Sequence, residues 1–112
     1  MTRSNDSIRQ PVANSLTARQ RAELRSLAHH LKPILHIGKE GVAEATVSAA
    51  IEAFSTREIM KIRVLENAPV GVRDSAEALS QQIGGAHVVQ VIGRTVVLYR
   101  RDPHHPKIEL GG

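Results

Sequence analysis

Residues 34–41 read ILHIGKEG, and residues 42–54 continue as VAEATVSAAIEAF. The first part is a short apolar run typical of a strand. The second part spaces its apolar residues as the buried stripe of a helix: Val47, Ala50, Ile51 and Phe54. Gly38 and Gly41 bracket the turn between the two parts. This stretch predicts a strand, a tight turn and a helix, and the other elements are assigned outward from it.

Before this stretch, a helix is predicted from about residue 16 to Pro33. Thr17 and Gln20 have the spacing of a capping box, and Pro33 ends the helix because the residue before proline avoids the α region. The expected buried stripe of this helix follows helical spacing: Leu24, Leu27, Ala28 and Leu31.

After this stretch, residues 58–65 alternate as a strand does. Three apolar residues share one face (Met60, Ile62 and Val64), and Lys61 and Arg63 share the other face. A third helix is predicted over residues 72–83, with four residues facing inward: Val72, Ala76, Leu79 and Ile83. Gly84 and Gly85 are interpreted as the C-terminal cap of this helix.

Residues 87–92 and 95–99 are β-rich, and Gly93 with Arg94 between them suits a type II′ hairpin turn. The predicted order is therefore α-β-α-β-α-β-β, a single α/β domain with helices packed on a four-stranded mixed sheet. Residues 1–14 are interpreted as a disordered N-terminal extension, residues 15–101 as the domain, and residues 102–112 as a loose or edge-hugging C-terminal tail.

The chain of 112 residues is basic, with 15 Lys+Arg against 11 Asp+Glu and a pI near 10.1. This balance favours a polyanionic partner. Phe54 and Tyr99 are its only Phe, Tyr or Trp residues, so contacts to a nucleic acid are expected to use phosphates and grooves more than base stacking. We expect a cytoplasmic protein, because we find no cysteine, signal peptide or membrane span.

The Gly38–Gly41 turn has two interpretations that the residues alone leave open. A glycine turn at a helix start lets a phosphate approach unpaired N–H groups, as the Gly-x-x-Gly loop of KH domains does, and Lys39 adds a charge. Glu40 opposes such binding. In the second interpretation, Gly38 merely ends the strand and Gly41 merely permits a positive φ before the helix.

Four segments in order carry a family resemblance: LTARQRAELRSLAHHLKP, IGKEG, REIMKIRV and QVIGRTVVLYR. The chain resembles YhbY-like proteins, the stand-alone bacterial form of the CRM domain (chloroplast RNA splicing and ribosome maturation), from about Leu16 to Arg100. This resemblance implies an RNA-binding protein with a fold similar to the C-terminal domain of translation initiation factor 3. It also implies association with ribosomal RNA in precursors of the large ribosomal subunit.

The resemblance implies a set of RNA-binding residues. The Gly-x-x-Gly loop falls on Gly38, Lys39, Glu40 and Gly41. The other basic positions of the family fall on Lys32, Lys61, Arg63, Arg94 and Arg100. We expect one positive field around the loop, formed by Lys32, Lys39, Lys61, Arg63 and Arg94.

Charge on the first helix adds two candidates. Arg21 and Arg25 share a side of that helix at i, i+4 and concentrate charge there. Several of these basic residues also have an ordinary interpretation: a solvated helix face for Arg21 and Arg25, a solvated strand face for Lys61 and Arg63, a polar hairpin tip for Arg94, and protection of a sheet edge for Arg100.

Other function classes find less support in the sequence. His29 and His30 are adjacent, so on a helix their side chains point about 100° apart and cannot readily share a metal ion. No nucleophile elbow, Walker loop or paired-carboxylate motif is present, so we expect no enzyme, no metal and no cofactor. A monomer is expected. The alternative function is a protein-interaction module that contacts a ribosomal protein or assembly factor through an exposed apolar patch, expected along the third helix.

Overall fold

The described part of the computed structural model, residues 15–111, has its elements in the predicted order. They are α1 (Ala18–Ala28), β1 (Pro33–Ile37), α2 (Glu44–Ala53), β2 (Ile59–Val64), α3 (Val72–Gln82), β3 (Ala86–Ile92) and β4 (Thr95–Arg100). The α/β fold class is thus confirmed. The prediction of a disordered extension over residues 1–14 lies outside the described residues.

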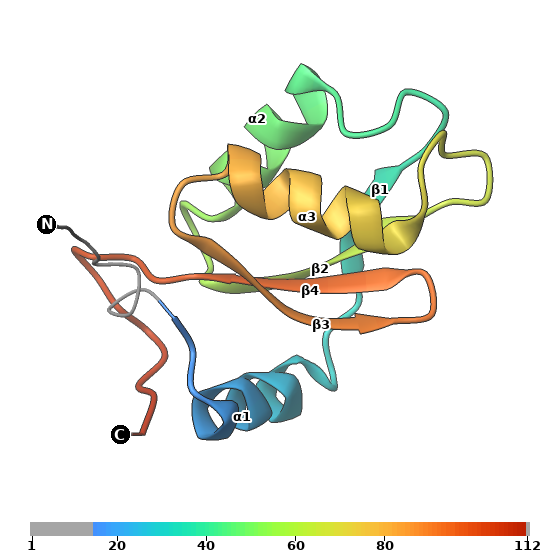
Figure 1. Cartoon of the computed structure of the whole chain (residues 1–112). Coiled ribbons are helices and arrows are strands. Elements are labelled where there is room, and N and C mark those ends of the chain that lie inside the picture. The colour runs from blue at the N-terminus through green and yellow to red at the C-terminus, as the bar shows by residue number, and fades with distance from the viewer. Residues whose placement is uncertain (1–14, 112) are drawn as a thin grey trace, which may run out of the picture.

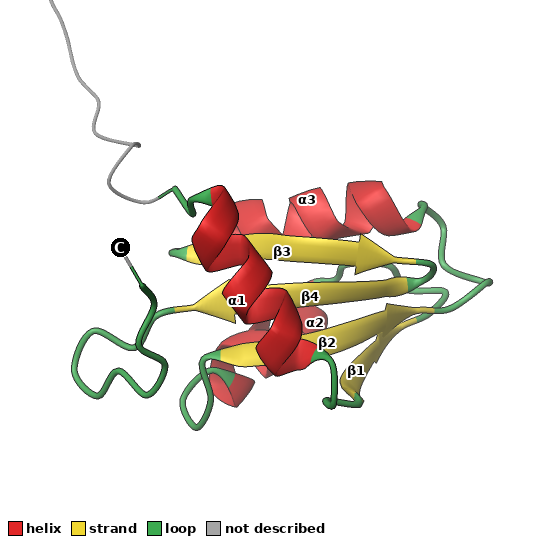
Figure 2. Cartoon of the chain, turned by 90° about the horizontal axis from the view of Figure 1, so that it is seen from below, coloured by secondary structure: helices red, strands yellow, loops and turns green. Residues whose placement is uncertain are grey.

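The four strands form one mixed sheet in the order β1-β2-β4-β3. β1 pairs with β2 in parallel, and β4 runs antiparallel between β2 and β3. Helices lie on both faces of this sheet: α2 and α3 cover one face, and α1 covers the other (Figure 1). Seen from the α1 side, α1 crosses β3, β4 and β2 at an angle, and β1 lies beyond the helix (Figure 2).

Each face of the sheet has its own hydrophobic core. The larger core joins α2 and α3 to the sheet through buried residues that include Phe54, Ile62, Leu79 and Leu98. The smaller core lies under α1 and contains five buried residues: Leu24, Ala28, Val89, Val97 and Tyr99. The residues of β4 from Val96 to Tyr99 alternate between the two cores and are at most 4% exposed, so this strand is the centre of the fold.

The N-terminus of α1 has the predicted capping box. Thr17 Oγ1 accepts from the backbone N–H of Gln20 at 3.0 Å, and Gln20 Oε1 accepts from the backbone N–H of Thr17 at 3.0 Å. These two bonds satisfy donors that the first turn of a helix otherwise leaves unpaired.

The C-terminal end of α1 differs from the prediction. The helix ends at Ala28 with His29 as its cap, well before Pro33. Leu27 is 50% and Leu31 is 37% exposed, so the expectation that both are buried was wrong. The helix meets the sheet through a narrow stripe around Leu24 and Ala28, and Leu31 lies beyond the helix in the connection to β1. The prediction for Ile51 of α2 was wrong in the same way, since it is 42% exposed.

The two glycine turns of the C-terminal half have different outcomes. Gly84 and Gly85 do not form a left-handed helix cap, because the cap residue Ile83 is extended. They form a separate tight turn, in which Ala86 N–H donates to the Ile83 carbonyl at 3.1 Å and Gly85 has a φ of +78°. Gly93 in the β3–β4 hairpin has a φ of +57°, the positive value expected at the first central position of such a turn.

The C-terminal tail was expected to be loose or to follow a sheet edge, but it packs on the α1 face of the sheet. Ile108 and Leu110 pack against the smaller core. The anchor is Glu58, which is 2% exposed. Its Oε1 accepts from the N–H groups of Lys107 and Ile108, and its Oε2 accepts from the N–H of Asp102, each at 2.7 Å. One buried carboxylate therefore satisfies three backbone donors of the tail.

Replacing Glu58 with glutamine is expected to lower the free energy of unfolding by about 2–3 kcal/mol. The amide would remove the negative charge and turn an NH2 group toward a backbone N–H, so one donor would face another. Urea unfolding measures the change, and Glu109→Gln on the exposed part of the same tail is the control. A Glu58→Gln protein as stable as the control would show that the anchor contributes little.

Candidate nucleic-acid interface

Three connections meet at one edge of the sheet. β1, β2 and β3 run in the same direction, because β1 is parallel to β2, and β4 is antiparallel to both β2 and β3. Their C-terminal ends therefore lie together, and the β1–α2 turn, the β2–α3 loop and the β3–β4 hairpin gather there (Figure 1). We call this the strand-end edge. Gly38, Lys39, Glu40, Gly41 and Arg94 all lie at it.

The Gly38–Gly41 turn is closed by its own backbone. Gly41 N–H donates to the Gly38 carbonyl at 2.9 Å, and Ala43 N–H donates to the Gly41 carbonyl at 3.0 Å. Gly41 is buried with a φ of +69°, and a Cβ atom there would lie 3.0 Å from Pro69 Cγ. The interpretation that Gly41 permits a positive φ before the helix is thus confirmed. The N–H groups of Gly41 and Ala43 are occupied, while Lys39 and Glu40 are exposed at the tip.

A shallow groove lies beside this turn, and five residues line it: Arg63, Leu65, Glu66, Asn67 and Arg94. A Cβ atom on Gly38 would lie 3.6 Å from Asn67 Oδ1, which places the turn against the same loop. Arg94 reaches Glu66 at 3.8 Å, an exposed pair in which Glu66 offsets part of the positive charge. Glu66 and Asn67 line this groove but are not among the site residues predicted from the sequence.

The predicted basic residues do not form one field around the turn, so that expectation was wrong. Lys32 is exposed just before β1, and Lys39 lies just after it, so the two lie at opposite ends of the strand. Arg100 ends β4 at the edge opposite Arg94, where its side chain lies beside Gly85. Lys61 and Arg63 share the α1 face of the sheet as predicted, but Lys61 Nζ donates to the Leu31 carbonyl at 3.0 Å and thereby holds the α1–β1 connection.

Arg21 has a structural partner. Its guanidinium donates to the carbonyls of Val88 and Val89, at the point where the β3–β4 register shifts. A bulge disrupts the ladder locally, and Arg21 provides a donor for two carbonyls at this point. The side chain is half-buried, in contrast to the exposed Arg25 one turn later.

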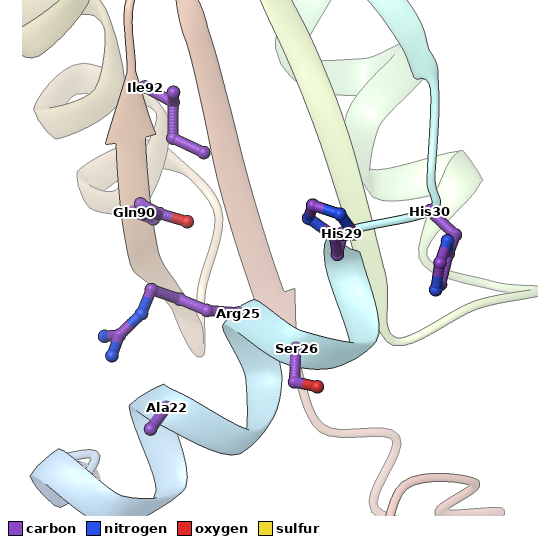
Figure 3. Close-up of a pocket in the computed structure, with 7 residues that line it drawn as sticks. All are labelled: Ala22, Arg25, Ser26, His29, His30, Gln90 and Ile92. Atoms are coloured by element: carbon purple, nitrogen blue, oxygen red, sulfur yellow. The ribbon is translucent and has the colours of Figure 1, made fainter.

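Arg25 lines a second groove, which lies between α1 and β3 (Figure 3). The α1 wall also includes Ser26 and His29, and Gln90 and Ile92 extend from β3 on the other side.

His29 and His30 lie edge to face, with their ring centroids 5.2 Å apart. Among residues 15–111, no group of three His, Cys, Asp or Glu side chains could hold a metal ion.

His87 lies in a different groove, near the N-terminal end of α1, and stacks on Tyr99 with ring centroids 6.3 Å apart. Burial, and secondarily the positive charge of Arg21, lowers the pKa of His87. Burial raises the pKa of the Tyr99 hydroxyl, and the negative charge of Glu58 raises it further, against a smaller opposing effect of Arg101. Both rings belong to the packing around the smaller core.

Exposed apolar side chains do not gather on α3, where the protein-interaction alternative expected them. The large ones are Leu27, Leu31, Ile34, Ile51, Val70 and Ile92. Leu31 and Ile34 line a common groove with Lys32 and Arg57, beside the edge strand β1.

In the described part of the chain, no helix is long and apolar enough to span a membrane.

Comparisons with known proteins agree with this architecture. The family model of the CRS1/YhbY (CRM) domain matches residues 16–100. The chain is 42% identical over 95 residues to "Probable RNA-binding protein YqeI" of Bacillus subtilis, covering 85% of this chain and 98% of that protein. It is 28% identical over 92 residues to "Probable RNA-binding protein PA4753" of Pseudomonas aeruginosa, covering 80% and 85%.

Among solved structures, SAV1595 of Staphylococcus aureus superposes with a TM-score of 0.73 at 38% identity, covering 87% of this chain and all of that one. The fold, a mixed four-stranded sheet with helices on both faces, is that of a small single-domain α/β protein. The chain belongs to the CRS1/YhbY (CRM) domain family.

Gly41→Ala is expected to lower the free energy of unfolding by about 1–3 kcal/mol, because the left-handed φ is unfavourable for alanine and its Cβ would lie 3.0 Å from Pro69 Cγ. Gly38→Ala is the matched control in the same turn, where a Cβ has ordinary contacts at 3.6 and 3.7 Å. Thermal or urea unfolding of both variants measures the difference. Equal stability of the two would contradict a backbone requirement at Gly41.

Stability is expected to fall as the pH drops through about 6.5, the ordinary pKa of histidine, because His87 has a lowered pKa in the folded protein. In that window the unfolded chain binds more protons than the native one, so acid favours unfolding. Urea unfolding at several pH values between about 7.5 and 5.5 measures this slope. His87→Gln is expected to make stability depend less steeply on pH, while the control His30→Gln, at an exposed position, is expected to keep the slope of the native protein. Identical slopes in the two variants would refute the assignment of the slope to His87.

Proposed function

We propose that this protein binds RNA and acts as an assembly factor for the large ribosomal subunit, docking on ribosomal RNA of its precursor. The proposal is supported by membership of the CRM family and by relatives that are named RNA-binding proteins. The association with the large subunit follows the family resemblance of the sequence. The protein would act by docking, as a cytoplasmic monomer without enzymatic activity.

The observation that carries the proposal is the strand-end edge. Lys39 is exposed at the tip of the turn, and Arg63 and Arg94 line the groove beside it. Lys39 lies in the β1–α2 turn, Arg63 on β2 and Arg94 in the β3–β4 hairpin. The shared direction of β1, β2 and β3 brings the three side chains to one edge of the sheet. Exposed cations that converge in this way suit a phosphate backbone.

The backbone of the turn supports the same role in a modified form. Since Gly41 and Ala43 use their N–H groups within the turn, a phosphate would meet the tip and the first turn of α2 instead. The N-cap of α2 is Ala43, which makes no side-chain capping bond. The first turn of a helix exposes unpaired N–H groups and a partial positive charge, both of which favour an anion. Glu40 and Glu66 at the same edge would limit the affinity of any one phosphate.

The test is affinity for large-subunit ribosomal RNA as a function of salt. A double variant, Lys39→Ala with Arg94→Ala, is expected to bind more weakly and to reduce the salt slope by about two, since each phosphate contact contributes about one. The control, Arg101→Ala with Lys107→Ala, removes the same charge from the C-terminal segment. If the native protein bound with a shallow salt slope, or if the two double variants behaved alike, the proposed edge would not be the RNA site.

A further inference from the structure

Charge is divided between the two faces of the molecule. The α2 and α3 layer carries four acidic side chains, Glu44, Glu52, Asp74 and Glu77, against the single basic Arg73. On the opposite face, α1 carries three arginines and one glutamate, and β2 adds Lys61 and Arg63. A polyanion that approaches the protein is therefore attracted to the α1 face and repelled by the other.

A row of four side chains crosses the α1 face of the sheet. Direct strand pairing joins His36 to Arg63, Arg63 to Thr95, and Thr95 to Ile92. The neighbours of these residues along their strands lie in the core on the opposite face: Ile37, Ile62, Val64, Val96 and Val91. Because side chains alternate along a strand, all four members of the row point to the α1 side. We call these four residues the cross-sheet row.

The cross-sheet row is accessible. His36 and Arg63 are exposed, Ile92 is 50% exposed and Thr95 is half-buried. The smaller core under α1 does not include any of the four. With neighbouring strands about 4.8 Å apart, the row is about 14 Å long. It presents an imidazole, a guanidinium and a hydroxyl group, and it ends on the apolar Ile92.

The groove between α1 and β3 continues this strip. Ile92 belongs to both the row and the groove, and Gln90 lies two residues earlier on β3 (Figure 3). The α1 wall contributes Arg25, Ser26 and His29. The lining residues include no acidic side chain, and Arg25 is exposed. The row and the groove together offer two guanidinium groups, imidazoles, an amide and hydroxyls.

The chemistry of this face favours base-paired RNA over a single strand. The one phenylalanine and the one tyrosine of the chain are 5% and 4% exposed, so neither can act as a stacking platform for unpaired bases, and the exposed rings of this face are the smaller imidazoles of His29, His30 and His36. The minor groove of an RNA duplex is wide and shallow and displays 2′-hydroxyls between its phosphates. A surface that combines hydroxyl, amide and imidazole groups with two arginines matches these features.

We propose that the cross-sheet row and the α1–β3 groove extend RNA binding from the strand-end edge, with which they share Arg63, across the α1 face, where they bind the shallow minor groove of a base-paired segment. Arg25 and Arg63 contact phosphates, while Gln90 and Thr95 contact 2′-hydroxyls. This inference rests on the proposed RNA-binding function. It adds to that function a contact outside the Gly-x-x-Gly loop and the structural class of RNA that is recognised.

The affinity test uses a short RNA duplex, a DNA duplex of the same sequence, and one RNA strand alone. The native protein is expected to prefer the RNA duplex over both. Arg25→Glu is expected to weaken duplex binding about tenfold more than Arg19→Glu, the same charge reversal on an exposed α1 residue outside the groove. Thr95→Glu, which places a carboxylate in the row, is compared in the same way with Ser48→Glu on α2. Circular dichroism verifies that each variant is folded.

Two results would overturn this inference while leaving the proposed function intact. In the first, the native protein binds RNA and the Lys39→Ala, Arg94→Ala variant binds more weakly, but Arg25→Glu and Thr95→Glu weaken binding no more than their controls do. The other is tighter binding of the single strand than of the duplex. Failure of the native protein to bind any of these RNAs or large-subunit ribosomal RNA would instead reject the proposed function itself.

Discussion

Burial of β4 on both faces is the constraint on which the rest of the structure depends. Val96 and Leu98 face one core, and Val97 and Tyr99 face the other. Such a strand must be covered by apolar layers on both sides. The α2 and α3 layer supplies one cover, while α1 supplies only part of the other. The C-terminal tail, held by Glu58, completes the second cover with Ile108 and Leu110.

The same topology creates the strand-end edge. With β4 antiparallel in the interior, the other three strands share a direction, and their C-terminal ends meet at one edge. Turns from distant parts of the chain are thereby brought together without any long loop. Because α1 crosses the sheet at an angle and leaves β1 outside (Figure 2), the cross-sheet row from His36 to Ile92 stays accessible on that face. The rigid sheet fixes the spacing of its side chains.

The Gly38–Gly41 turn is shaped by a backbone requirement at its second glycine. Gly41 must be glycine because its φ is positive and Pro69 lies against it. That geometry closes the turn and leaves Lys39 exposed at its tip. Of the two interpretations that the sequence left open, the structure confirms the positive φ of Gly41, while the N–H groups of Gly41 and Ala43 are bonded within the turn.

The sequence by itself determined the order of the elements, the capping box of α1 and the positive φ of the glycine turns. These features depend on residues close together in the chain, where periodicity and local hydrogen bonds decide the outcome. It also supplied the basic residues, but not which of them are available. Only the tertiary structure decided that Arg21 bonds to Val88 and Val89, Lys61 to Leu31, and Glu58 to the tail. The partner in each pair lies tens of residues away, so strand register and helix placement, which no local pattern encodes, determine which charges remain free.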